Sequence, residues 1–252
     1  MNSSFISKYK LTIILTLTLA VFLASCISLP TTTPTPGWVV TTLAGNGTAG
    51  HHDATGTEAQ FNYPTGVAVD PSGILYVADA GNHCIRKITS AGVVTTLAGS
   101  GTRGHKDAIG TAAQFDGPVG VAVDSSGILY VADAGNGRIR KITSTGVVST
   151  FAGSTYGYKN ATGEAAQFDT PFDVAVDSSG ILYVADLSNH RIRKITSAGV
   201  VSTLAGGYRG HYDATAQRRS LTIPPAWPWI HPAISMWQIQ ETTAYGKLYR
   251  QG

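Results

Sequence analysis

Acidic side chains recur at fixed places along this chain, and repeated acids are the residues that could hold a metal ion. A calcium site needs about six to eight oxygen ligands that converge on one point. Each of these aspartates is instead followed by turn residues, without the spacing of a dedicated metal loop. We therefore interpret them as turn caps and expect neither a metal nor a cofactor. One equivalent set is Asp70, Asp124 and Asp177, and the other is Asp79, Asp133 and Asp186.

Basic side chains form a second repeated set that could bind nucleic acid. A ring of guanidinium groups can follow a phosphate backbone, but the formal net charge of the chain is only +3. A charge this small is a weak argument for a nucleic-acid partner, and we expect none. We interpret the basic residues as part of solvated outer strands, where charge discourages edge-to-edge pairing. They are Arg86-Lys87, Arg138, Arg140-Lys141, Arg191 and Arg193-Lys194.

These charged residues lie in a stretch that occurs three times. The stretch at residues 66–89, GVAVDPSGILYVADAGNHCIRKIT, returns at 120–143 and at 173–196. A fixed period of this size indicates an array of supersecondary units. One unit, residues 39–89, has four short runs rich in β-branched residues, at 39–43, 67–69, 74–78 and 84–89. Because turn residues separate these runs and no 3.6-residue period is present, the unit predicts an all-β fold.

Each unit also has a long glycine-rich connection between its first and second strands. The connection contains Ala-Gln-Phe in every copy and closes with Pro64, Pro118 or Pro171. A four-stranded unit with a long link fits a propeller blade. The segments PTGVAVD at 64–70, LYVAD at 75–79 and Asn82 to Ile88 resemble the NHL repeat, and the resemblance covers about residues 39–215. It implies a β-propeller of NHL type, usually six-bladed. We expect the propeller of this chain to be incomplete, with three blades and the start of a fourth.

The resemblance raises an enzymatic alternative. Six-bladed relatives include lactonases and an amidating lyase, whose metal ligands are unrepeated acids and histidines at the channel mouth. Asp173 replaces Gly66 and Gly120 at the start of the inner strand, which makes it a weak channel-mouth candidate. A metal site normally needs three or more protein ligands, so we expect no enzyme but a binding or scaffold module for a protein or glycan. Other blade-specific residues are His52, His83, His105, His190, His211 and Cys84.

The N-terminus carries a targeting pattern. Lys8 and Lys10 precede a mostly apolar run at residues 11–24, which is shorter than the roughly 20 residues that span a bilayer. The run ends in Leu-Ala-Ser-Cys, which resembles the lipobox of bacterial lipoproteins. We predict a signal peptide at 1–25, a lipid on Cys26 and a Pro/Thr-rich linker at 26–37. The exported propeller, at 38–215, would then be anchored to the outer membrane or cell surface. The alternative is an ordinary secretory signal in which Cys26 is incidental.

The repeat stops within its fourth copy. Residues 200–206 begin that copy, but residues 216–252 lack the expected strands and hold three of the four tryptophans. Read from the last base of each codon, residues 226–233 can encode Val-Ala-Val-Asp-Ser-Ser-Gly. We therefore interpret the tail as the disordered product of a frameshift between about residues 215 and 220; the alternative is a genuine extension. Because an unclosed array exposes apolar surface, we expect marginal stability or a homodimer that completes the ring.

The coding DNA tests the frameshift. We expect the neighbouring reading frame over residues 216–252 to spell another repeat, including Tyr-Val-Ala-Asp opposite residues 235–239. Sequencing of the locus checks this directly. A neighbouring frame without these strands would contradict the frameshift and favour a genuine C-terminal extension.

Overall fold

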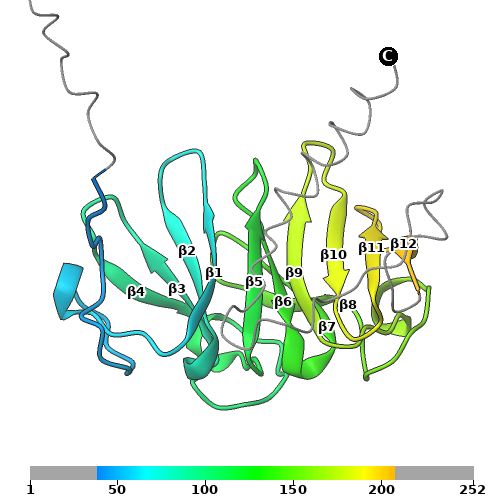
Figure 1. The fold of residues 1–252 in the computed structure, drawn as a ribbon, viewed down its shortest axis with the longest axis horizontal. Helices are drawn as coiled ribbons and strands as arrows, with labels where there is room; N and C mark the ends of the chain where they lie inside the picture. Colours follow the sequence, from blue (N-terminus) through cyan, green and yellow to red (C-terminus); the bar gives the residue numbers. More distant parts are fainter. Residues whose placement is uncertain (1–38, 208–252) are drawn as a thin grey trace, which may run out of the picture. The chain divides into compact units, whose positions relative to one another are not determined.

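The structure is a computed structural model that describes residues 39–207. The predicted signal peptide, Cys26 and the tail at 216–252 lie outside the described residues. Residues 1–41 and 42–252 form two separate units, and the fold concerns residues 42–207. This part has three four-stranded antiparallel sheets and short 3-10 turns (Figure 1). No helix among the described residues is long and apolar enough to cross a membrane.

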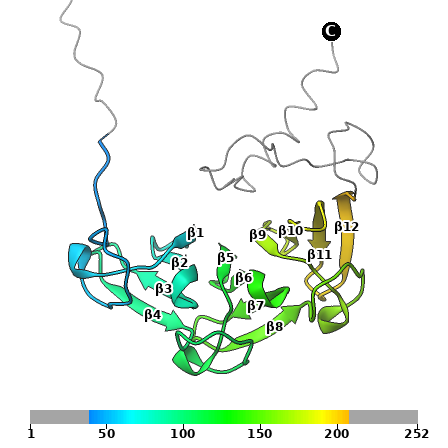
Figure 2. The same ribbon diagram turned by 60° about the horizontal axis from the view of Figure 1, so that its bottom comes forward.

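Each sheet is built from four strands that follow one another along the chain, and we call each sheet a blade. Figure 2 shows the three blades fanned along an arc, with β1, β5 and β9 innermost. The first blade contains β1 (Pro64–Val69), β2 (Leu75–Asp79), β3 (Cys84–Ile88) and β4 (Val94–Ala98). The second contains β5 (Pro118–Val123), β6 (Leu129–Asp133), β7 (Arg138–Ile142) and β8 (Val148–Ala152). The third contains β9 (Pro171–Val176), β10 (Leu182–Asp186), β11 (Arg191–Ile195) and β12 (Val201–Gly206).

The all-β fold and the three blades are confirmed, but the strands are grouped differently from the sequence expectation. Residues 39–43 form no strand. Residues 94–98, which were expected to begin the second unit, form β4 and pair with β3 as the last strand of the first blade. The cause is a tight hairpin, in which the Thr89 carbonyl accepts the Gly92 N–H at 2.9 Å. β12 likewise pairs with β11, so it completes the third blade and does not begin a fourth.

The first set of aspartates caps turns, as predicted. Asp70 Oδ1 accepts the backbone N–H groups of Ser72 and Ile74 at 2.9 and 3.0 Å, and its Oδ2 accepts the Tyr76 hydroxyl at 3.1 Å. The Ser72 hydroxyl and these other donors hold the pKa of the Asp70 carboxyl below its usual range. Asp124 and Asp177 make the same two backbone contacts in their own blades.

Apolar side chains between neighbouring blades form the core. Phe115, Val121 and Leu129 of the second blade and its link pack with Tyr76 and Ala78 of the first. The second and third blades repeat this arrangement with equivalent residues. The innermost strands approach closely: a Cβ on Gly66 would lie 2.4 Å from the Val119 carbonyl oxygen. Glycine is therefore required there for neighbouring inner strands to pack in this way.

Candidate functional site

One arginine in each blade, Arg86, Arg140 or Arg193, is buried, and for these three the prediction of a solvated outer strand is wrong; Arg138 and Arg191 are half-buried. Arg86, on the third of four strands, is fully buried. Its Nη1 donates to Asp79 Oδ2 at 2.7 Å and to the Gln60 carbonyl at 2.9 Å. Its Nη2 donates to Asp53 Oδ1 at 2.6 Å and to the His52 carbonyl at 3.0 Å. One side chain thus joins the sheet to the glycine-rich link that crosses it, and we call this group the arginine cluster.

The other two blades repeat the arginine cluster with one difference. Arg140 bonds Asp133 at 2.9 Å and also Asp107. Arg193 bonds Asp186 at 2.6 Å, but its second side-chain partner is Asn160, at 2.8 Å. The third cluster therefore has one carboxylate fewer. Lys87, Lys141 and Lys194, which follow these arginines, are only half-buried.

The Ala-Gln-Phe element supplies the remaining contacts of each cluster. The Phe61 ring lies 4.9 Å from the guanidinium carbon of Arg86, a distance typical of a cation–π contact. Phe115 and Phe168 do the same for Arg140 and Arg193, at 5.1 and 5.0 Å. The element therefore positions the link against the sheet.

The second set of aspartates belongs to these clusters, so its interpretation as simple turn caps is wrong. Asp79 is fully buried and accepts the Asn62 backbone N–H at 2.7 Å and the Asn82 amide at 2.8 Å. Asp53 is partly exposed. Its partial burial disfavours the charge, but the Thr96 N–H and the Arg86 guanidinium outweigh this and lower the pKa of the Asp53 carboxyl. These charges are used within the fold.

The candidate at the channel mouth, Asp173, belongs to no group of three metal-ligating side chains within residues 39–207. It is half-buried near the start of β9, its Oδ1 accepts the Val174 N–H at 2.9 Å, and it lies against Gly120. No three His, Cys, Asp or Glu side chains gather as a metal site within residues 39–207. No three histidines gather at one point among the described residues either. His83, in the first blade, accepts the Gly117 N–H on its Nδ1 at 3.0 Å.

Two further residues that differ between the copies, His51 and Cys84, are also held within the fold. His51 Nε2 lies 2.9 Å from Thr96 Oγ1, as the Tyr158 hydroxyl does from Thr203 Oγ1, so His51 and Tyr158 are equivalent. Cys84 is fully buried, and burial raises the pKa of its thiol to about 12. At neutral pH the thiol is protonated, which makes it a poor nucleophile.

Exposed side chains that differ between blades gather on the links of the second and third blades. Arg103 donates from Nε to Asp116 Oδ1 at 2.7 Å, and its side chain is 73% exposed. Tyr156, its counterpart in the third link, donates its hydroxyl to the Gly135 carbonyl and is 55% exposed. Tyr158 stacks on the Arg191 guanidinium at 3.7 Å. We call Arg103, Tyr156 and Tyr158 the link surface; sequence reasoning missed it.

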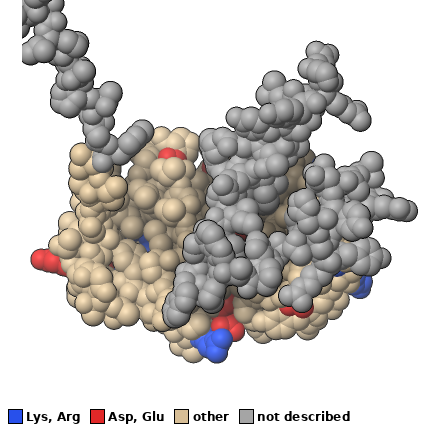
Figure 3. All heavy atoms as spheres, in the orientation of Figure 1, with Lys and Arg blue, Asp and Glu red and all other residues tan. Residues whose placement is uncertain are grey.

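Charged groups are sparse on the face of the molecule that Figure 3 presents. Acidic and basic side chains lie beside one another along its lower rim, and no extended basic area is visible among the described residues on that face.

Three antiparallel four-stranded sheets fanned about their inner strands define an incomplete β-propeller. The chain is an NHL-repeat protein: the NHL repeat matches residues 61–88, 115–142 and 168–195, each spanning the first three strands of one blade and the link residues just before them.

Known proteins with similar chains are longer than this one. NHL repeat-containing protein 2 of Bos taurus is 33% identical over 195 residues, which cover 66% of this chain and 27% of that protein. Teneurin-4 of Mus musculus is 30% identical over 164 residues, 55% of this chain and 6% of that protein. A Bacteroides thetaiotaomicron crystal structure of unknown function is 25% identical, with a TM-score of 0.52 over 64% of this chain and 40% of that one.

The arginine clusters predict unequal effects for two substitutions in the second blade. Arg140→Met leaves Asp133 buried without its cation and should lower the free energy of unfolding by about 3–5 kcal/mol. Asp107→Asn gives the second blade the residue that the third blade already has. Because Asp107 is 45% exposed, this change should cost at most about 1 kcal/mol. Urea unfolding measures both, and equal losses would contradict the role assigned to Arg140.

Proposed function

We propose that this chain is a binding or scaffold module for a protein or glycan, exported and lipid-anchored through Cys26. The observation that carries the proposal is the contrast between strands and links. The strands repeat almost unchanged, and their buried charges are paired in the arginine clusters. Exposed side chains that distinguish the blades lie on the links, and Arg103, Tyr156 and Tyr158 of the link surface are among them. A rigid scaffold with varied loops is a common arrangement for binding.

The chemistry of the link surface supports a macromolecular ligand. Tyrosine and arginine are enriched in protein interfaces because each combines an apolar body with a hydrogen-bonding end. Tyr156 and Tyr158 are both held by hydrogen bonds through their hydroxyls, so their rings are fixed before a ligand arrives. A fixed ring loses little conformational entropy on binding.

Asp173 favours a second candidate function, a fragment of a metal-dependent lactonase- or lyase-like propeller enzyme. It is an acid near the start of an inner strand, where the other blades have glycine. The enzyme candidate requires specific uptake of a divalent metal by the purified protein, lost in Asp173→Ala. The binding module requires ligand capture without metal.

Binding through the link surface can be tested with two immobilised probes, purified peptidoglycan and a mixture of soluble exported proteins. We expect wild-type protein to be retained on at least one of them. A variant with Arg103→Ala and Tyr156→Ala should lose about tenfold or more in affinity, because such residues are frequent hot spots. The matched control is Ser126→Ala in an exposed turn of the second blade. Equal retention of both variants would contradict the link surface as the binding site.

The lipid anchor is tested separately from the ligand. Cells fed a labelled fatty acid should label the wild-type chain, and membrane fractionation should recover it in the pellet. Cys26→Ser removes the acylated thiol, so the label should be lost and the anchoring weakened. Cys84→Ser is the control, since this buried residue lies in the described propeller. Retained label in Cys26→Ser would show that Cys26 is not the attachment site.

A further inference from the structure

The first blade has an apolar face whose counterparts in the other blades are covered. Val67 of β1 is 64% exposed, whereas Val121 of β5 and Val174 of β9, at the same place, are 6% and 3% exposed. In the second and third blades this face packs on the blade before it. The first blade therefore presents one uncovered half of an interface that the described chain forms twice.

The third blade presents the other half. Ala78 of β2 and Ala132 of β6 are fully buried against the blade that follows each of them. Ala185 occupies the same place on β10 and is only half-buried. The two ends of the described array thus carry complementary faces, because the same pair of faces meets at both internal junctions.

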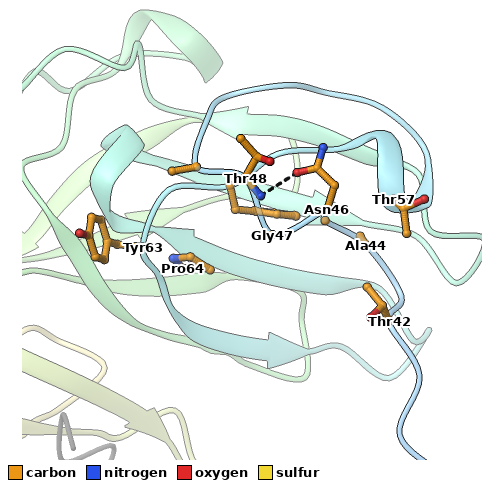
Figure 4. A pocket seen from close by; sticks show the side chains of 11 residues that line it. Thr42, Ala44, Asn46, Gly47, Thr48, Thr57, Tyr63 and Pro64 are labelled. Atoms are coloured by element: carbon orange, nitrogen blue, oxygen red, sulfur yellow. Dashed lines mark hydrogen bonds between the residues drawn. The ribbon is translucent and has the colours of Figure 1, made fainter. Parts of the chain in front are cut away.

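A pocket of about 960 Å³ lies beside the first blade (Figure 4). Its lining includes Gly47, Phe61 and Tyr63. In the second blade, a Cβ on Gly101 would lie 3.8 Å from the Asn82 carbonyl oxygen of the preceding turn. On Gly47, which is equivalent to Gly101, such a Cβ meets no described atom within 4 Å. The space that a turn fills in the second blade is thus open in the first.

The third blade has a turn that matches this pocket. In the first blade, His83 Nδ1 accepts the N–H of Gly117 in the next link at 3.0 Å. His190 occupies the same place in the third blade, with a φ of 52° against 51° for His83. The counterpart of Gly117 in the first link is Tyr63. His190 of another copy can therefore accept the Tyr63 N–H and repeat this contact.

We propose that two copies of this chain bind head to tail, with the third blade of each against the first blade of its partner. The arc in Figure 2 leaves the two end faces on separate blades, so both contacts can form at once. Head-to-tail contacts either close into a ring or continue into a filament. A ring of two copies covers all four apolar faces and contains six blades.

Two details distinguish this junction from the internal ones. Asp173 stands where Gly66 and Gly120 approach the next blade, so the docked copy must lie slightly farther away at the inner strands. Two segments could also supply the outer strand at this junction. They are residues 200–206 of one copy and residues 39–45 of its partner. β12 is paired with β11 over five residue pairs, while residues 39–43 form no strand. Residues 39–43 of the partner are therefore the part that moves aside.

Two full-length chains with different affinity tags, produced in one cell, test this arrangement. Wild-type copies should co-purify. Val67→Asp in both chains, or Ala185→Arg in both, should reduce co-purification about tenfold or more, because each buries a charge at every junction. A Val67→Asp chain paired with an Ala185→Arg chain should still co-purify, since one junction then has two intact faces. Contacts through one shared surface would not give this rescue.

Control variants separate docking from loss of folding. Ile109→Asp alters a residue that is 66% exposed but lies on a link, and it should leave co-purification unchanged. Val40→Pro should also leave it unchanged, while Asp173→Gly should strengthen it. The proposal is overturned if folded wild-type copies do not co-purify, if Val67→Asp copies still do, or if the mixed pair fails. Loss of assembly in Val40→Pro would overturn the assignment of the outer strand to β12.

Discussion

A buried guanidinium in each blade is the interaction on which the rest of the structure depends. An arginine stays charged when buried, so the fold must surround it with acceptors. Asp79 supplies one from the sheet, and Asp53 with two link carbonyls supplies the others. Asp53 in turn accepts the Thr96 N–H of β4 at 2.8 Å. One charge therefore fixes the path of a long link that has no sheet of its own.

The sequence was sufficient to predict the all-β fold, the three blades and the caps at Asp70, Asp124 and Asp177. It did not show where a blade begins, because a tandem repeat can be divided at any point of its period. The pairing is decided by the hairpin at Thr89 and Gly92, which folds β4 back onto β3. That difference also explains the error over the arginines. A strand thought to be outermost suggested solvent, whereas β3 is central and the link covers Arg86.

The link surface could not be assembled from the sequence either. Arg103 and Tyr156 occupy equivalent places in consecutive links, and their difference from Ala49 is visible in the repeat. Sequence alone does not show that Arg103 also approaches Asp116, or that the Tyr156 hydroxyl reaches the preceding turn. These contacts depend on how one blade is placed beside the next, and that placement follows from the apolar packing between blades and the glycines of the inner strands.

The reactivity of the Cys84 thiol reports whether the first blade is folded. The chain has two cysteines, and an acyl group on Cys26 would leave Cys84 as its sole thiol. In the folded blade this thiol is buried and protonated, so alkylating reagents and oxidants reach it only when the blade opens. Disulfide-linked chains in an oxidising envelope would therefore record past unfolding, whereas a ring of intact chains would be held by non-covalent contacts alone.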